Sequence, residues 1–270
     1  MITQSYTEDK GIKIFSPSKE EDYQDYDEKR LNNLYAQEEK HFWFITRKEY
    51  ILQKIEKYIQ KESNIIEIGA GTGNVARYLK KNGYKNISVG EMHLNGLKYA
   101  QSYGIKECYQ LNLLDTPFEN EFDAMCLFDV LEHIDDDDLV IKNINKSLKK
   151  NGKLILTVPA HEWLWSRDDI VAGHKRRYNK TDLIQKLQKF GFEVVVSKYF
   201  FISITPLFLL RKILHKDTHQ PVRDNEHNSG LYIHPIINFI LLHISRLENK
   251  IHYLLPSFFG GSLFVIARKR

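Results

Sequence analysis

Ile65-Ile66-Glu67-Ile68-Gly69-Ala70-Gly71-Thr72-Gly73-Asn74 is an apolar run that ends in an acid and continues into a glycine-rich turn. The run predicts a strand, and residues 75–82 predict the helix that follows. Glycines let the backbone pass close to a ligand, and a helix start offers unpaired N–H groups. The spacing differs from the G-x-G-x-x-G of dinucleotide enzymes, because Asn74 stands at the third glycine position. The leading acid suits a ligand with an ammonium or sulfonium group, and a tight turn without a ligand is the alternative.

Strands and helices alternate around this turn. Apolar runs at 65–68, 87–90, 105–111, 122–128, 154–158 and 194–200 are separated by helical stretches, most of which stop at a glycine. Continuous apolar runs are typical of strands buried on both faces. The order predicts an α/β fold with a doubly wound, mostly parallel sheet, in which ligands bind beyond the carboxyl ends of the strands.

The chain divides into four predicted units. Residues 1–60 are expected to form an N-terminal helical lid, and 61–200 the α/β core. Residues 201–261 are expected to form an apolar and basic helical insertion, and 262–270 the last strand of the core.

Composition excludes several classes of protein. The net charge of +4 is mild and does not indicate nucleic-acid binding. Cys108 and Cys126 lie in apolar strand-like runs and are expected to be reduced core residues. The N-terminus is polar and acidic, without the pattern of a secretory signal, and no apolar run reaches the roughly 18 residues needed to span a bilayer. These features predict a cytoplasmic location, with membrane association as an open alternative.

Over roughly residues 64–200, and again at the last strand, the chain resembles the class I S-adenosylmethionine-dependent methyltransferases. The resemblance implies a seven-stranded Rossmann-like sheet with S-adenosylmethionine (SAM) as cofactor. It assigns Glu67, Gly69, Gly71 and Gly73 to the motif that wraps the methionine part of the cofactor. Glu91, at the end of the second strand, matches the carboxylate that accepts both ribose hydroxyls.

The resemblance also implies an adenine pocket. Met92 would pack on the ring, and Leu113 would offer it a backbone N–H. Asn112 stands where the family usually has an aspartate that contacts the adenine amino group. Residues 122–134 resemble the fourth strand and its following turn, which places Asp129 among the cofactor-binding residues.

Three further motifs resemble a bacterial subgroup that is often associated with sugar, polysaccharide or lipid-linked pathways. They are His41-Phe42-Trp43-Phe44 with Arg47, Val158-Pro159-Ala160-His161 with Trp163 and Trp165, and Gly173-His174-Lys175-Arg176-Arg177-Tyr178. The resemblance favours a lid at the first motif, with Arg47 near the carboxylate of the cofactor. Attachment of the N-terminal helix to the sheet is the alternative.

Methyl transfer needs a base where the acceptor must lose a proton. The predicted catalytic residues, which could remove that proton or orient the acceptor, are Glu132, His133 and His174. Asp129, Glu132 and His133 share one side of a helix if Asp129 begins it. A capping box between Asp129 and Glu132 is the alternative.

The loop that carries His174 is densely cationic. Arg176, Arg177 and Tyr178 suit an anionic group on the acceptor, and pairing of a solvated turn with the acids at 168–169 is the alternative. Trp163 is expected to stack on a sugar or line the acceptor pocket, or else to pack in the interior.

No metal is expected from the sequence. The acids Asp135 to Asp138 suit solvent or a helix N-terminus better than a metal ion. His215 and His219 have helical spacing but no evident third ligand.

The insertion carries an amphipathic pattern. Apolar residues recur at helical spacing over 235–255, with Arg246 and Lys250 mostly off the stripe: Ile236, Ile237, Phe239, Ile240, Ile244, Leu247 and Ile251. Such a face suits a membrane interface or a lipid substrate, and equally a sheet edge or a homodimer seam.

The sequence thus predicts a SAM-dependent methyltransferase that modifies an oxygen or nitrogen of a small or lipid-linked, anionic acceptor. A nicotinamide-dependent oxidoreductase and a non-catalytic SAM-binding module are the alternatives, and Asn74 counts against the first of them.

Overall fold

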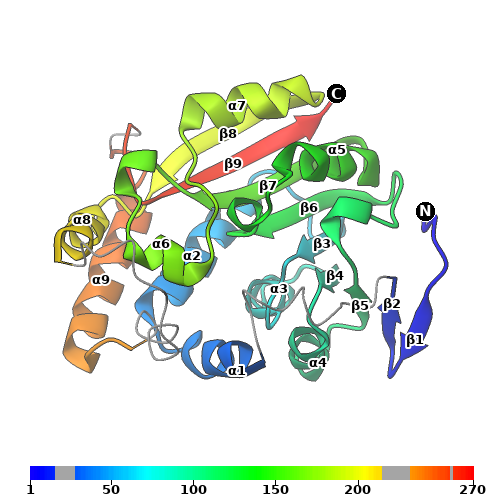
Figure 1. Ribbon diagram of the computed structural model, residues 1–270, viewed down its shortest axis with the longest axis horizontal. Helices are drawn as coiled ribbons and strands as arrows, with labels where there is room; N and C mark the ends of the chain where they lie inside the picture. Colours follow the sequence, from blue (N-terminus) through cyan, green and yellow to red (C-terminus); the bar gives the residue numbers. More distant parts are fainter. Residues whose placement is uncertain (16–27, 215–231, 256–257) are drawn as a thin grey trace.

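The computed structural model describes residues 1–15, 28–214, 232–255 and 258–270. Within them, nine strands form one sheet in the order β1-β2-β5-β4-β3-β6-β7-β9-β8 (Figure 1). The strands are β1 (Thr7–Asp9), β2 (Ile12–Ile14), β3 (Asn64–Ile68), β4 (Asn86–Glu91), β5 (Glu107–Gln110), β6 (Phe122–Phe128), β7 (Leu148–Pro159), β8 (Phe192–Phe200) and β9 (Ser262–Lys269). The sheet is parallel from β2 through β7, whereas β1, β8 and β9 run antiparallel to their neighbours. The mixed, mostly parallel α/β fold is confirmed.

The predicted count of seven strands is wrong, because a hairpin near the N-terminus extends the sheet. Strand β2 pairs with β5 in parallel, with Ile12 opposite Cys108. The Ile12 side chain is buried there, and Lys13 forms an ion pair with Glu107 at 2.9 Å. Residues 1–60 are therefore only partly helical.

Helices cover both faces of the sheet. They are α1 (Glu28–Gln37), α2 (Phe42–Ile55), α3 (Asn74–Lys81), α4 (Leu94–Ser102), α5 (Asp137–Ser147), α6 (Arg167–Ala172), α7 (Lys180–Lys189), α8 (Thr205–Leu214) and α9 (Pro235–Ile251), with short 3₁₀ turns η2 (Leu113–Asp115), η3 (Leu131–His133) and η4 (Glu162–Leu164). The amphipathic stretch at 31–59 forms two helices, with His41 as the N-cap of the second.

Two apolar cores lie on opposite faces, because successive strand residues point to opposite sides. Ile65 packs in the core beneath α2, α3 and α4, whereas Ile66 packs in the core beneath α5 and α7. Each buried aliphatic side chain of this kind stabilises the fold by about 1.5–3 kcal/mol. The arrangement leaves the carboxyl ends of β3 and β6, where the strand order reverses, free to carry a site.

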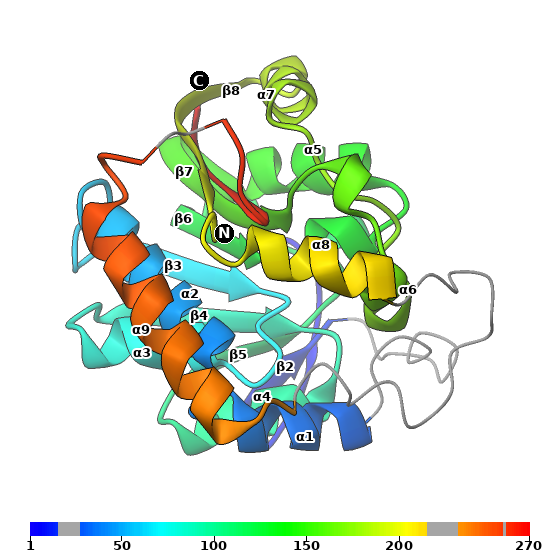
Figure 2. The same cartoon turned by 90° about the vertical axis from the view of Figure 1, so that its left-hand side faces the viewer.

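Helix α9 packs with its polar side inward. The Asn238 side chain accepts the N–H of Phe42 at 2.8 Å, and the Asn249 amide donates to the carbonyl of Thr46 at 3.0 Å. Glu248 is buried and accepts the N–H groups of Ile202 and Ser203, both at 2.8 Å. The outer side of the helix exposes large apolar side chains: Ile236, Ile237, Phe239, Ile240, Ile244 and Leu247. The predicted stripe is therefore exposed, on a helix that packs against α2 outside the sheet (Figure 2).

Within the described ranges, no helix combines the length and the apolar character needed to cross a bilayer.

Candidate functional site

A cavity of about 890 Å³ opens at the carboxyl ends of β3, β4 and β6. Its wall combines the glycine turn with α1, α2, the turn after β6, the α6 region and α8. The volume lies in the upper part of the roughly 300–1,000 Å³ range of small-molecule sites. It therefore has room for a nucleoside-sized cofactor and part of an acceptor.

The glycine turn needs glycine at its three positive-φ positions, which are Gly69 (66°), Gly71 (55°) and Gly73 (78°). A Cβ at Gly69 would lie 2.5 Å from the Val130 side chain, and one at Gly73 would lie 2.8 Å from Cβ of Ala100. Both contacts are too short for any side chain larger than hydrogen. The turn is thus held tightly against its neighbours while its inner side lines the cavity.

Glu67 and Glu91 both line the cavity. Glu67 accepts the N–H of Ala76 at 2.6 Å, and burial raises its pKa to about 8. Glu91 accepts backbone N–H groups from Gly71 at 2.8 Å, Met92 at 2.8 Å and His93 at 3.1 Å. These donors hold the Glu91 carboxylate in one orientation at the cavity wall.

The predicted adenine residues Met92, Asn112 and Leu113 lie together on the cavity wall. The Asn112 side-chain oxygen accepts the N–H of Leu114 at 2.9 Å and caps η2. This local bond gives the Asn112 side chain a structural role, because it fixes the 3₁₀ turn that carries Leu113. The adenine contact itself remains a prediction.

The aromatic motif at the start of α2 both attaches the helix and lines the cavity. Phe42 is buried in the core, while Trp43, Phe44 and Arg47 reach the cavity wall. The Arg47 guanidinium lies 4.3 Å from the Trp43 ring centroid and pairs with Asp129. The motif thus attaches the N-terminal helix to the core, as the alternative interpretation predicts. Its role as a lid over the cofactor stays a prediction.

Asn74 ties the glycine turn to the N-terminal helices. Its side-chain oxygen accepts the Lys48 ammonium at 3.0 Å. Glu38, which the sequence reasoning missed, lines the cavity and accepts the Thr72 hydroxyl at 2.5 Å. Burial raises the pKa of Glu38 to about 7. The sequence pattern that could have indicated Glu38 is its helical spacing from Leu31 and Leu34, which places the three side chains on one face.

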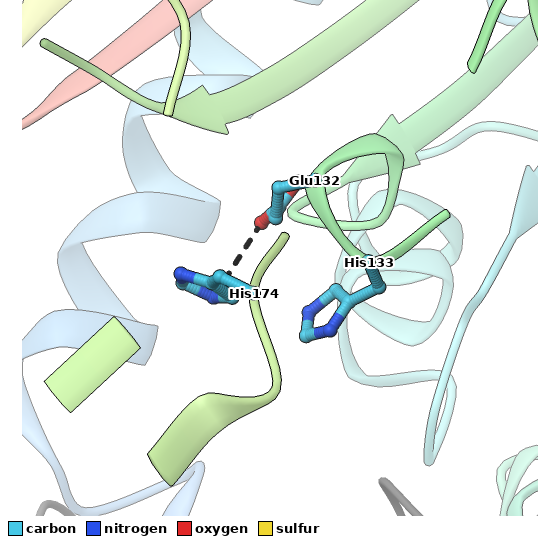
Figure 3. A group of neighbouring side chains, drawn as sticks. All are labelled: Glu132, His133 and His174. Atoms are coloured by element: carbon cyan, nitrogen blue, oxygen red, sulfur yellow. Dashed lines mark ion pairs between the residues drawn. The ribbon is translucent and has the colours of Figure 1, made fainter. Parts of the chain in front are cut away.

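Glu132, His133 and His174 meet at the cavity wall, although 41 residues separate the outer two (Figure 3). His174 Nε2 lies 3.9 Å from Glu132 Oε1, and the His133 and His174 rings are 4.9 Å apart. Burial raises the pKa of Glu132 well above its usual range, and Asp129 raises it further.

The turn that carries Glu132 has a different form from the one predicted. Asp129 has a left-handed φ of 57° and begins no helix, so the capping box with Glu132 is absent. A 3₁₀ turn follows, and α5 starts only at its N-cap Asp136, whose side chain accepts the N–H of Leu139 at 2.9 Å. This geometry leaves the Glu132 carboxylate without a local backbone partner.

Asp169 is a second residue that the prediction of the site missed. It accepts His174 Nδ1 at 2.8 Å and the Nε of Arg177 at 2.8 Å, and its side chain is fully buried. Ser166 and Asp169 form the capping box of α6, and the S-x-x-D pattern that signals it is readable in the sequence.

Of the residues predicted to bind the acceptor, only Arg177 lines the cavity. Arg176 lies 3.1 Å from Asp137, and the Tyr178 hydroxyl donates to the same carboxylate at 2.8 Å. Trp163 is about half exposed and lies outside the cavity wall. The structure thus gives Arg176 and Tyr178 structural partners, and the assignment of these two residues and Trp163 to the acceptor stays a prediction.

Three of the acids at 135–138 lie at the N-terminus of α5, where they cap the helix or form ion pairs. Asp136 caps it, Asp137 is buried between Arg176 and Lys186, and Asp138 forms an ion pair with Lys189 at 2.7 Å. His215 and His219 lie outside the described residues, as does the acidic tract at 20–22.

The parallel sheet, the glycine turn at its reversal point and the oriented Glu91 together define the class I SAM-dependent methyltransferase fold. Comparison with family models assigns the chain: residues 43–197 match the methyltransferase domain, so the protein belongs to this family. The matched residues thus form the domain of a SAM-dependent methyltransferase, a class that uses SAM as methyl donor. This finding decides against the nicotinamide-dependent oxidoreductase.

Individual relatives are distant. A ubiquinone biosynthesis O-methyltransferase of Rickettsia canadensis is 26% identical over 117 residues, which cover 41% of this chain and 50% of that protein. The chain thus spans about half the length of the curated relatives it matches. A possible histamine N-methyltransferase of Thermotoga maritima superposes with a TM-score of 0.56 at 18% identity, over 89% of this chain and 98% of that one. A phosphoethanolamine N-methyltransferase of Haemonchus contortus, solved with SAM, gives 0.54 at 18% identity, over 81% and 52%.

Proposed function

We propose that the enzyme methylates a hydroxyl oxygen of an acceptor that carries a long apolar chain. One observation carries the proposal: the Glu132, His133 and His174 cluster shares a cavity wall with the glycine turn. Methyl transfer from a sulfonium is an in-line displacement that depends on positioning, and a hydroxyl acceptor must also lose its proton. A buried cluster of carboxylate and imidazole groups beside the cofactor loop suits that task.

Oxygen is favoured over nitrogen by the curated relatives. The curated relatives matched by sequence are named O-methyltransferases. The N-methyltransferases among the solved structures are only 18% identical, so they support the fold and not the acceptor atom. The cluster could remove the proton from a hydroxyl on an aromatic ring and from a sugar hydroxyl in the same way.

The acceptor is expected to be uncharged near the reacting atom. The expectation of an anionic acceptor depended on the basic loop, whose Arg176 and Arg177 are now paired with buried aspartates. Arg211, which also reaches the cavity, binds Asp168 through two hydrogen bonds of 2.7 Å. Neither the loop nor α8 therefore offers an unpaired guanidinium to a phosphate.

An apolar chain on the acceptor is supported by the insertion. Leu207 and Phe208 of α8 line the cavity, and Leu210, Ile213 and Leu214 of the same helix are exposed. Helices α8 and α9 lie on the same side of the molecule (Figure 2), and both expose large apolar side chains. We infer that this side, the α8–α9 apolar face, contacts a membrane surface.

The test uses transfer of label from [methyl-³H]SAM to extracts of cells that lack the gene. Purified enzyme is incubated with the organic and aqueous phases separately, and Glu132→Gln serves as the control variant. We expect label in the organic phase, in an ether that resists mild base, and at least about a hundredfold less with the variant. Label confined to the aqueous phase, or equal labelling by Glu132→Gln, would contradict the proposal.

A further inference from the structure

The Glu132 carboxylate has an unusual environment. Its side chain is completely buried, and neither oxygen has a hydrogen-bond partner among the described residues. A buried, unpaired carboxylate is costly, so buried acids normally have hydrogen bonds, an ion pair or a metal ion. The nearest titratable nitrogen, His174 Nε2, is 3.9 Å away, which is too long for a hydrogen bond.

The orientation of His174 is fixed from its other side. Asp169 accepts a hydrogen bond of 2.8 Å from Nδ1, and Arg177 and the backbone N–H of Ser166 hold the Asp169 carboxylate in turn. Since a carboxylate accepts the bond, the proton of a neutral His174 lies on Nδ1. The Nε2 lone pair then faces Glu132 from 3.9 Å, and no hydrogen bond joins the two side chains (Figure 3).

His133 completes a set of three donors. One nitrogen of His133, one of His174 and one oxygen of Glu132 all lie within 4.8 Å of one another. An ion held at about 2.0–2.2 Å from each atom requires donor separations somewhat shorter than this, which side-chain rotation supplies. Histidine oriented by a carboxylate through its second nitrogen is the usual arrangement around a protein-bound metal.

We propose that Glu132, His133 and His174 bind one divalent transition-metal ion, with Asp169 as the residue that orients His174. Two imidazoles and one carboxylate suit Zn²⁺, Fe²⁺ or Mn²⁺, whereas Mg²⁺ and Ca²⁺ prefer oxygen-only sites. The sequence predicts these three residues as catalytic and predicts no metal, because only closely spaced acids and histidines suggest a metal site in a sequence and His174 lies in a distant loop.

The role of the ion rests on the proposed function. Three protein ligands leave a coordination position that faces the cavity, where the acceptor hydroxyl would bind. Coordination lowers the pKa of a bound hydroxyl, whose proton passes to solvent. The oxygen lone pair then forms the O–CH₃ bond while the S–CH₃ bond breaks. The electron pair of the broken S–CH₃ bond stays on the sulfur of S-adenosylhomocysteine.

Metal binding is tested on the full chain without cofactor or acceptor. Protein dialysed against chelator is titrated with Zn²⁺ by calorimetry, and with Mn²⁺ by electron paramagnetic resonance. We expect one ion per chain, and affinity reduced by at least about a hundredfold in Glu132→Gln and His174→Ala. Asp169→Asn should weaken binding by about 10–100-fold. His243→Ala, at an exposed histidine on α9, controls for adventitious binding and should change nothing.

Circular dichroism and SAM binding establish that each variant is folded. Binding by the wild type that is absent or not stoichiometric, or that persists in folded Glu132→Gln and His174→Ala, would overturn the metal site. Methyl transfer that continues in chelator would overturn the role of the ion and leave the proposed function standing. Stoichiometric metal binding without any transfer would instead contradict the proposed function alone.

Discussion

At the residue scale, the cavity wall carries buried acids whose surroundings differ. Glu91 is oriented by three backbone N–H groups, Glu67 by one, and Glu132 by none. Glu91 and Glu67 lie at the ends of β4 and β3 and were predictable: the strand–turn pattern indicated Glu67, and the family resemblance indicated Glu91. Glu38 was missed because its partner Thr72 lies 34 residues further along the chain. Asp169 was considered only as an ion-pair partner of the basic loop, and its bond to His174 depends on the fold of that loop.

Glu67 leads to a pH prediction. Burial raises its pKa to about 8 in the free protein, so its protonated form stabilises the fold at low pH and that contribution is lost as pH rises through 8. A cationic ligand favours the ionised form. SAM affinity should therefore increase between pH 6.0 and 7.5, by up to about tenfold per pH unit.

Calorimetry across this range measures the slope, and Glu67→Gln should flatten it. An unchanged slope in the variant would mean that another group is responsible.

At the element scale, most boundaries followed from apolar periodicity and glycine stops. The predicted strand at 122–128 matches β6, and the predicted helix at 75–82 lies within one residue of α3 at each end. The start of α5 differed because Asp129 adopts a left-handed conformation, which a helical spacing cannot reveal. Helix α9 was found by its apolar stripe, but its orientation was not predictable, because polar anchors hold it together with Leu241 and Leu242 while most of the stripe stays exposed.

Glu248 is the anchor whose removal should cost most. It accepts two backbone N–H groups and the Ser203 hydroxyl, all at the start of the insertion. Glu248→Ala leaves buried donors unsatisfied and should lower the free energy of unfolding by about 2–4 kcal/mol, measured by urea denaturation.

Glu193→Ala is the matched control, because Glu193 forms only an exposed ion pair with Arg268. Its effect on the free energy of unfolding should be much smaller than that of Glu248→Ala, because an exposed ion pair contributes little. Equal effects of the two changes would contradict the anchoring role.

At the scale of the whole molecule, the insertion joins the cavity wall to the α8–α9 apolar face. Arg246 lies beside this face but is paired with Glu49, so apolar contact is expected to contribute more than charge. The extent of the face was readable from the sequence, whereas its exposure emerged only from the packing of α9 on α2.

Vesicle flotation tests this face. The wild type should float with phosphatidylcholine vesicles, with little added by phosphatidylglycerol, because burying apolar side chains supplies the free energy. The triple variant Ile236→Ser, Ile240→Ser and Leu247→Ser should stay in solution, while Val195→Ser, an exposed apolar position on β8, should behave as wild type. A wild type that fails to float, and that the triple variant converts from dimer to monomer, would assign the face to a second copy instead.

The most direct measurement of the central claim is calorimetry of the full chain with SAM, with NAD as the matched dinucleotide. The cavity geometry predicts one SAM site per chain, no heat with NAD, and binding weakened at least about tenfold by Glu91→Ala, which removes a charge-assisted contact. Binding of NAD without SAM, or SAM affinity unchanged in a folded Glu91→Ala variant, would contradict the account.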